Sequence, residues 1–155
     1  MGRRYSEQEN KLIENVIIFL INEYSKTGFN EKPVIFHSMR VACRLVEIDA
    51  SASTIAAAIL HDLIEDSEVT LGKIADIFGK EISKLVGAVS FKSNIKDKKK
   101  QYEEMFKRTR KAGEQALIIK CADILDNSDY YSFGKNKEHE DLLMSKLNYF
   151  LKMAQ

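Results

Sequence analysis

Residues 54–66 read TIAAAILHDLIED, an apolar run that ends with one histidine and three acids. The small alanines favour a helix that packs closely against its neighbours. Because each residue of a helix advances by about 100°, we expect His61 to lie in line with Glu65, and Asp62 in line with Asp66. Four titratable groups at one end of an apolar helix are costly unless a cation or a ligand balances them. The stretch therefore predicts a buried helix that carries a functional site.

The remainder of the chain is also predicted to be helical. Ser6 and Glu9 form a capping-box pattern that opens the first helix. One proline and seven glycines leave few breaks, and no stretch alternates with the period of a strand. We therefore expect an all-α, single-domain helical bundle over residues 1–155, with about eight helices. They are expected to begin near residue 6 and to cover residues 34–48, 54–66, 71–79, 81–91, 97–112, 114–133 and 139–153.

Composition narrows the class of protein. The chain has 155 residues, of which 45% are hydrophobic and 30% charged, as expected for one globular domain. Its 24 basic and 23 acidic residues give a net charge of +1, so we expect no nucleic-acid partner and no membrane partner. The sequence has no signal-peptide pattern, and Cys43 and Cys121 lack a C-x-x-C partner, which favours a cytoplasmic protein with reduced thiols. The oligomeric state is left open.

Two further residues extend the cluster at His61 and Asp62. His37 interrupts the apolar face of its predicted helix, and Asp123 lies in the apolar segment ALIIKCADILDN, where an unpaired carboxylate would be expensive. Two histidines and two aspartates from three helices are typical of a metal site in the core of a bundle. Imidazole and carboxylate ligands suit Mn²⁺ or another divalent transition metal such as Fe, Co or Zn. Lys120, one turn before Asp123, is the expected charge partner of that carboxylate.

The ordered pattern H…HD…D resembles the HD superfamily of metal-dependent phosphohydrolases. Within that superfamily, the chain is most similar to the hydrolase domain of the RelA/SpoT family, which removes the 3′-pyrophosphate from ppGpp. H-D-x-x-E-D is more specific than a bare His-Asp pair, because the Glu-Asp is typical of this branch. The matching stretches occur in family order and span most of the chain: HSMRVA (37–42), LHDLIEDSEVT (60–70), IADIFGKEISKLVGAVSF (74–91) and IIKCADILDN (118–127).

The resemblance implies a role for each matching residue. It implies a nucleotide substrate, and Mn²⁺ bound by His37, His61, Asp62 and Asp123. Glu65 and Asp66 would position and deprotonate the attacking water, which suits carboxylates next to a metal. Asn127, one turn after Asp123, would form a hydrogen bond with the ribose or a phosphate of the nucleotide.

The chain also departs from the RelA/SpoT pattern around the substrate. The family has an Arg-Lys pair shortly before the first histidine, in a segment ending P-Y-x-x-H-P. Here Gly28-Phe29 replaces the pair and Ser38 replaces the proline, while a longer loop spacing would bring Lys26 into the basic role. The family's A-D-R-L-H-N reads A-D-I-L-D-N, and we expect the additional acid, Asp126, to repel a highly charged anion.

Two alternatives to a ppGpp 3′-pyrophosphohydrolase therefore stay open. A nucleoside 5′-monophosphatase or another HD phosphatase would release orthophosphate rather than pyrophosphate. A non-catalytic nucleotide-sensing module would bind without turnover, although such a module has no need of a water-activating pair. The basic run at residues 96–100, KDKKK, is interpreted as a solvated helix start.

Overall fold

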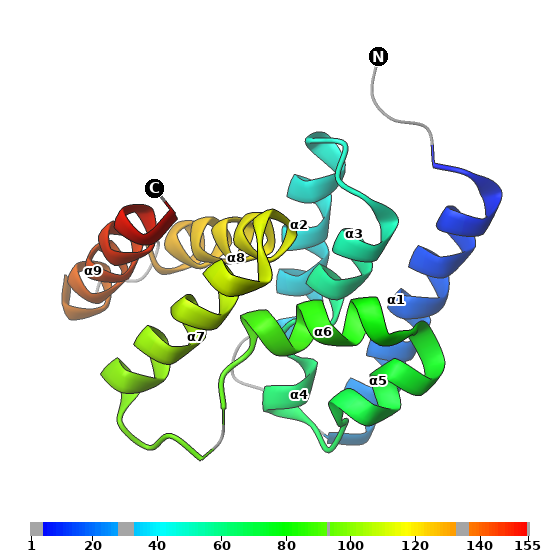
Figure 1. Cartoon of the computed structure of the whole chain (residues 1–155), viewed down its shortest axis with the longest axis horizontal. Helices are drawn as coiled ribbons and strands as arrows, with labels where there is room; N and C mark the ends of the chain where they lie inside the picture. The colour runs from blue at the N-terminus through cyan, green and yellow to red at the C-terminus, as the bar shows by residue number, and fades with distance from the viewer. Residues whose placement is uncertain (1–4, 28–32, 93, 133–136, 155) are drawn as a thin grey trace.

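A computed structural model describes residues 5–27, 33–92, 94–132 and 137–154 of the chain. Within these ranges the chain forms helices and no strand, which confirms the predicted all-α class (Figure 1). No helix in the same ranges is long and apolar enough to cross a membrane. The described helices are α1 (Glu7–Thr27), α2 (Val34–Glu47), α3 (Ala52–Ile59), α4 (Leu63–Asp66), α5 (Leu71–Phe78), α6 (Lys80–Val89), α7 (Lys98–Ala112), α8 (Glu114–Ser132) and α9 (Lys137–Ala154).

Local sequence signals set several of the helix starts. At α1 the Ser6 amide donates to Glu9 Oε2 at 2.9 Å, and the Glu9 amide donates to Ser6 Oγ at 3.2 Å, as the capping-box pattern predicted. Ser51 caps α3 and Thr70 caps α5, each accepting from the amide three residues on at 3.2 Å. These caps fix where the elements around the acidic stretch begin.

The helix predicted over residues 54–66 is in fact two helices, although the Asp66 amide still donates to the Asp62 carbonyl at 3.2 Å, as within one helical turn. The chain turns at residues 60–62, between α3 and α4 (Figure 1). In a continuous helix the Ala58 carbonyl would accept from the amide of Asp62, but here it accepts from His61 Nδ1 at 2.7 Å. The His61 carbonyl likewise accepts from Ser90 Oγ at 2.6 Å. Side chains therefore satisfy the carbonyls at which the helix stops.

The position of α3 at the centre of the bundle explains its alanines. It packs against α1, α2, α6 and α8, and each residue from Thr54 to Ile59 is at most 1% exposed. Small side chains allow four neighbours to approach one short helix. Because α3 lies at the centre, the turn that follows it lies in the interior, between α2 and α8.

A second, smaller core forms where α7 and α9 pack on α8. Its buried members are Met105, Phe106, Ile124 and Phe150, with Tyr102 packed against them. Tyr102, Met105 and Phe106 thus form an apolar stripe on the otherwise charged α7. Helix α8 thus belongs to both cores and carries polar residues between them.

Candidate functional site

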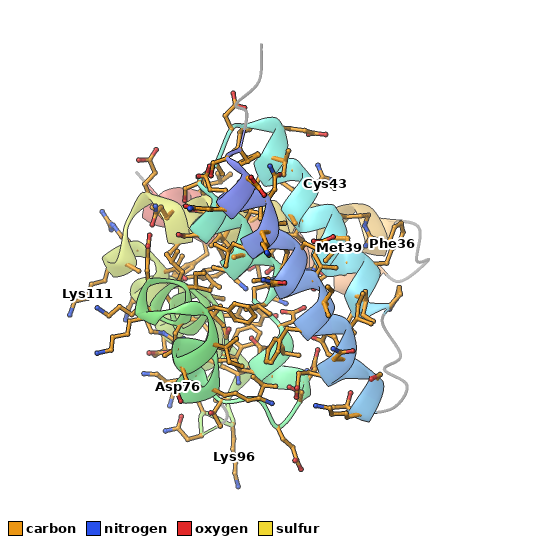
Figure 2. The ribbon with its side chains drawn as sticks, turned by 90° about the vertical axis from the view of Figure 1, so that its right-hand side faces the viewer. Phe36, Met39, Cys43, Asp76, Lys96 and Lys111 are labelled. Atoms are coloured by element: carbon orange, nitrogen blue, oxygen red, sulfur yellow. The ribbon has the colours of Figure 1, made fainter. Side chains whose placement is uncertain are left out.

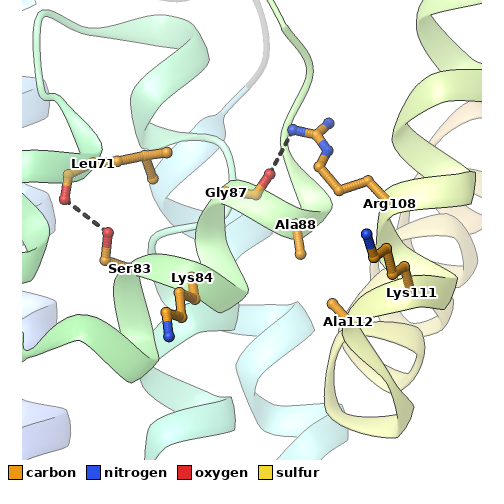
Figure 3. Close-up of a pocket in the computed structure, with 8 residues that line it drawn as sticks. All are labelled: Leu71, Ser83, Lys84, Gly87, Ala88, Arg108, Lys111 and Ala112. Atoms are coloured by element: carbon orange, nitrogen blue, oxygen red, sulfur yellow. Dashed lines mark hydrogen bonds between the residues drawn. The ribbon is translucent and has the colours of Figure 1, made fainter.

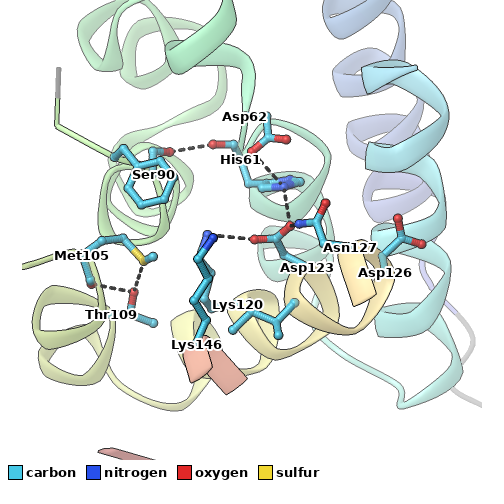
Figure 4. Close-up of polar contacts among 12 residues, drawn as sticks. His61, Asp62, Ser90, Met105, Thr109, Lys120, Asp123, Asp126, Asn127 and Lys146 are labelled. Carbon is cyan, nitrogen blue, oxygen red and sulfur yellow. Dashed lines mark hydrogen bonds and ion pairs between the residues drawn. The ribbon is translucent and has the colours of Figure 1, made fainter. Parts of the chain in front are cut away.

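The four predicted metal ligands converge on one point, and Figure 4 shows three of them, His61, Asp62 and Asp123. His37 Nε2 lies 3.2 Å from His61 Nε2, 3.2 Å from Asp123 Oδ1 and 3.5 Å from Asp62 Oδ2. His61 Nε2 lies 3.1 Å from Asp62 Oδ1 and 3.5 Å from Asp123 Oδ1. Both imidazoles are fully buried and Asp123 is 4% exposed. Helix α2, the turn between α3 and α4, and helix α8 supply these side chains.

The hydrogen bonds made by Nδ1 of each imidazole determine whether Nε2, which faces the cluster, is free to bind a cation. His37 Nδ1 faces Asp126 Oδ2 at 2.7 Å, and His61 Nδ1 faces the Ala58 carbonyl at 2.7 Å. Both partners accept hydrogen bonds, so each Nδ1 carries a hydrogen, and any further proton or cation must bind at Nε2. The two Nε2 atoms face one another at 3.2 Å beside carboxylate oxygens. This donor set fits a divalent cation.

Fixed charges balance the carboxylates of the cluster. Lys120, also buried, donates from Nζ to Asp123 Oδ2 at 2.8 Å, which confirms the predicted charge partner. Burial opposes ionisation of Asp123, but Lys120 and the two imidazoles outweigh it and hold the pKa of this carboxyl well below its usual range. Burial also favours a neutral His61, yet Asp62 and Asp123 outweigh it and raise the pKa of His61 to about 10. The cluster therefore strongly attracts positive charge.

Glu65 and Asp66, the predicted catalytic acids, follow the cluster on α4. Glu65 Oε1 accepts from the Phe91 amide at 2.7 Å, which ties α4 to the end of α6. The residue is exposed overall, but its carboxyl end lies among protein atoms. Loss of hydration there, together with the negative Asp62, raises the pKa of Glu65 to about 7. Asp66 is exposed at the end of the same short helix.

The two predicted substrate-binding residues lie in different surroundings. Asn127 Nδ2 donates to Asp123 Oδ1 at 2.6 Å, so its amide lies beside the metal cluster. Lys26 is exposed in the last turn of α1, where its Nζ lies 2.7 Å from Glu23 Oε1. The Gly28-Phe29 position lies outside the described residues. Residues 98–100 form the exposed start of α7, as predicted for the basic run.

Asp126 was predicted to be an acid that repels anions, and this interpretation is wrong. The residue is 1% exposed and lies between α8 and α2. Arg40 Nε donates to Asp126 Oδ1 at 2.8 Å, and an Arg40 terminal nitrogen donates to Oδ2 at 2.7 Å. Burial alone would raise the pKa of Asp126, but the hydrogen bonds from Arg40 and His37 outweigh it and lower this pKa. The spacing R40…D126 gave no signal for this contact.

A basic edge borders the cluster on the side of α7 and α9. Lys146 Nζ donates to Tyr102 Oη at 2.6 Å and lies 3.9 Å from the centre of that ring. Partial burial and the positive charges of Lys98 and Lys120 lower the pKa of Lys146 to about 8. Lys146 cannot be recognised as a site residue from the sequence, because its helix has an ordinary amphipathic pattern.

The end of α6 is held separately from the metal cluster. A groove between α5, α6 and α7 contains Arg108, which donates to the Gly87 carbonyl at 2.7 Å (Figure 3). A second nitrogen of Arg108 donates to the Ser90 carbonyl at 2.6 Å. These contacts satisfy carbonyls at the C-terminus of α6. They also hold Ser90, whose hydroxyl contacts the His61 carbonyl.

Tyr24 is a further residue near the acids that sequence analysis did not identify. It is 4% exposed on α1, and its hydroxyl has no hydrogen-bond partner among the described residues. Burial, Asp62, Asp66 and Glu65 all raise the pKa of this phenol, so it keeps its proton. An unpaired buried donor carries a desolvation cost of about 1–3 kcal/mol.

Removing that hydroxyl should therefore not weaken the fold. We expect Tyr24→Phe to leave the free energy of unfolding unchanged or to raise it by about 1 kcal/mol, measured by urea denaturation of the protein with a chelator present. The matched control is Thr109→Val, because the buried Thr109 hydroxyl is 2.9 Å from the carbonyl oxygens of both Ala88 and Met105. That variant should lose about 1–3 kcal/mol. Equal losses in both variants would contradict an unpaired Tyr24.

The sequence model of one family, described as HD domain, matches residues 19–155. The chain belongs to the HD domain family. HD domain proteins bind divalent metals, and the cluster of His37, His61 and Asp123 could hold such an ion.

Several curated relatives share the name of one activity. The chain is 30% identical over 149 residues to a probable guanosine-3′,5′-bis(diphosphate) 3′-pyrophosphohydrolase of Mycoplasma pneumoniae, covering 85% of this chain and 20% of the relative. It is 38% identical over 104 residues to the corresponding enzyme of Aquifex aeolicus, covering 66% and 14%. It is 36% identical over 107 residues to the bifunctional (p)ppGpp synthase/hydrolase SpoT of Escherichia coli, covering 66% and 15%. The chain thus spans only 14% to 20% of the length of these relatives.

A solved structure has the same fold as this HD domain. It is that of a metazoan ortholog of SpoT that hydrolyzes ppGpp, and it superposes with a TM-score of 0.81 at 20% sequence identity. The match covers 99% of this chain and 89% of the other. The likeness extends through the whole helical order, from α1 to α9.

Proposed function

We propose that this HD domain is a Mn²⁺-dependent phosphohydrolase that removes the 3′-pyrophosphate from ppGpp. The observation that carries the proposal is the inward direction of both Nε2 atoms, which lie 3.2 Å apart beside two aspartates. Such a set calls for a divalent cation. The curated relatives named for this 3′-pyrophosphohydrolase activity support the choice of substrate.

The proposed mechanism assigns the proton transfer to Glu65. A bound divalent metal would be held by His37, His61, Asp62 and Asp123, and would polarise a phosphate oxygen and acidify water. Glu65 takes a proton from the attacking water, a task that suits a carboxyl group whose pKa is about 7. Asp66, next to it on α4, helps to position that water.

The bonds change in a single displacement at phosphorus. The water oxygen bonds to the phosphorus that is attached to O3′ of the ribose, and the bond from that phosphorus to O3′ breaks. O3′ leaves with a proton, so the products are GDP and pyrophosphate. Asn127 and Lys26 are proposed to contact the nucleotide.

The basic edge of the site suits a polyphosphate. Lys146 is half-buried, and its Nζ contacts a neutral phenol oxygen at 2.6 Å. Its charge adds to that of Lys120 on the side of the cluster that faces α9. A cation partly removed from water attracts an anion more strongly than a fully hydrated one. The arrangement therefore offsets the loss of a basic pair at Gly28-Phe29.

The test is Mn²⁺-dependent product release from ppGpp, with Asp62→Ala protein as the control. Pyrophosphate and GDP should appear with the wild-type protein alone. Orthophosphate released from nucleoside 5′-monophosphates, with no turnover of ppGpp, would favour the monophosphatase alternative. Thermal stabilisation by ppGpp without turnover, in protein that holds its metal, would indicate a sensing module.

A further inference from the structure

His37 is the only one of the two imidazoles whose outer nitrogen is fixed by a side chain. His61 Nδ1 donates to the carbonyl of its own preceding turn, Ala58, at 2.7 Å. His37 Nδ1 instead donates to Asp126 Oδ2 at 2.7 Å, across 89 positions of sequence. The orientation of the His37 ring is therefore set by a residue on another helix, α8.

Asp126 is itself fixed by a planar, two-point contact. Arg40 Nε and a terminal nitrogen approach its two oxygens at 2.8 and 2.7 Å. Two parallel charge-assisted bonds define an orientation as well as a distance. Arg40 lies one turn after His37 on α2, so one helix supplies both donors and the carboxylate of α8 lies between them. The contact holds α2 and α8 in register at the metal cluster.

The far side of Arg40 reaches the surface. Its side chain is 30% exposed, and its guanidinium lies 4.6 Å from the centre of the Phe36 ring. Phe36, itself 62% exposed, lies on the outer face of α2 with Met39 and Cys43 (Figure 2). A substitution at Arg40 can therefore be accommodated by solvent, whereas Asp126 is surrounded by protein.

We propose that Asp126 and Arg40 form a positioning pair that holds the His37 ring with Nε2 toward the metal and thereby sets the affinity of the site for a divalent cation. The inference rests on the proposed metal site, and not on the identity of the nucleotide. Carboxylates that orient a ligating histidine commonly contribute about 10–100-fold to metal affinity.

An asparagine at position 126 shows why the charge and both oxygens matter. His37 Nδ1 and Arg40 each require an acceptor, but an amide has one accepting oxygen and one donating nitrogen. In Asp126→Asn, the amide nitrogen must replace one of the two oxygens, so at least one of the three hydrogen bonds is lost, and the negative charge that strengthens the others is removed. Arg40→Gln removes the two-point guanidinium contact with Asp126 and leaves the carboxylate in contact with His37 alone.

The experiment measures Mn²⁺ binding to the full chain after metal removal, by calorimetry and by the electron paramagnetic resonance signal of free Mn²⁺. Asp126→Asn and Arg40→Gln should each raise the dissociation constant about 10–100-fold. The double variant should raise it by less than the product of the two, because both changes act through one ring. Asp76→Asn is the matched control, since this exposed aspartate lies on α5 (Figure 2), a helix that supplies no ligand, and should leave the constant unchanged.

The visible spectrum of Co²⁺-loaded protein provides a readout that a general loss of stability would not shift. Both variants should change its band positions, because the ligand field depends on the orientation of the His37 ring. Wild-type dissociation constants and spectra in folded Asp126→Asn and Arg40→Gln would overturn the proposal. If Asp126→Asn does not fold, the partly exposed Arg40→Gln variant decides the question by the same two measurements.

The outcomes separate this inference from the proposed activity. Wild-type protein that binds Mn²⁺ but does not hydrolyse ppGpp would overturn the activity and leave the positioning pair intact. Equal Mn²⁺ affinity in wild type and variants would overturn the pair and leave the activity. Wild-type protein that binds no divalent metal would overturn both.

Discussion

Asp62→Ala protein is expected to lose both its bound metal and its turnover. Asp62 places one oxygen 3.1 Å from His61 Nε2 and the other 3.5 Å from His37 Nε2, so alanine removes the only carboxylate that α4 and its preceding turn direct at both rings. Residues that merely orient a ligand contribute about 10–100-fold to metal affinity, and loss of a ligand should cost more. A metal supplies several kcal/mol to such a reaction, so turnover should fall at least about 10³-fold.

The fold should tolerate this substitution. Asp62 precedes α4 but makes no side-chain capping bond, and the turn is held by Ser90 and by the His61 side chain. Metal content after dialysis and the rate of pyrophosphate release are the two measurements. Asp76→Ala, which removes an exposed carboxylate from α5, should match the wild type in both. An Asp62→Ala protein with wild-type turnover would rule out the proposed metal mechanism.

Glu65→Gln should separate turnover from metal binding, which Asp62→Ala removes together. Glutamine has nearly the same shape, and its amide oxygen can still accept from the Phe91 amide, which lies 2.7 Å from Glu65 Oε1. It cannot take a proton from water. We therefore expect metal affinity close to that of the wild type and a kcat lower by about 10²–10⁴-fold, the usual contribution of a general base.

The pH dependence gives an independent check on Glu65. A base acts in its deprotonated form, so the wild-type rate should rise as the pH increases through about 7, the pKa of Glu65. This rise should be absent from the residual rate of Glu65→Gln. Glu68→Gln, an exposed acid three residues on, is the control and should keep the wild-type profile. A Glu65→Gln enzyme with wild-type kcat would assign the proton transfer elsewhere.

Sequence was most informative where neighbouring residues decide the structure. The capping box at Ser6 and Glu9 depends on contacts three residues apart, and it formed as predicted. The ordered histidines and aspartates also predicted which four side chains would meet, since each stood out as a polar group in an apolar segment. The helix expected over residues 34–48 ends at Glu47, and Ile48 is 59% exposed.

Sequence failed where the decisive partner is remote. The break after α3 requires the hydroxyl of Ser90, which lies 29 positions beyond the carbonyl it contacts. From the sequence, Asp126 was interpreted as an additional negative charge, because its partner Arg40 lies 86 positions away. In both cases the local sequence pattern was present, but a tertiary contact with a remote residue determined the structure that formed.

The metal cluster is assembled from three separate segments of the chain, which links catalysis to folding. His37, the His61-Asp62 turn and Asp123 come from segments that share no local contact in the extended chain, and they meet only after α2, α3 and α8 have docked. An unfolded chain presents these ligands separately and cannot reproduce the chelate. The free energy released when a cation is captured therefore becomes free energy of folding, amounting to about 2.7 kcal/mol when the cation is present at a hundred times its dissociation constant. A bound catalytic ion would thus stabilise the folded bundle, and the free metal concentration in the cell would govern how long the protein stays folded.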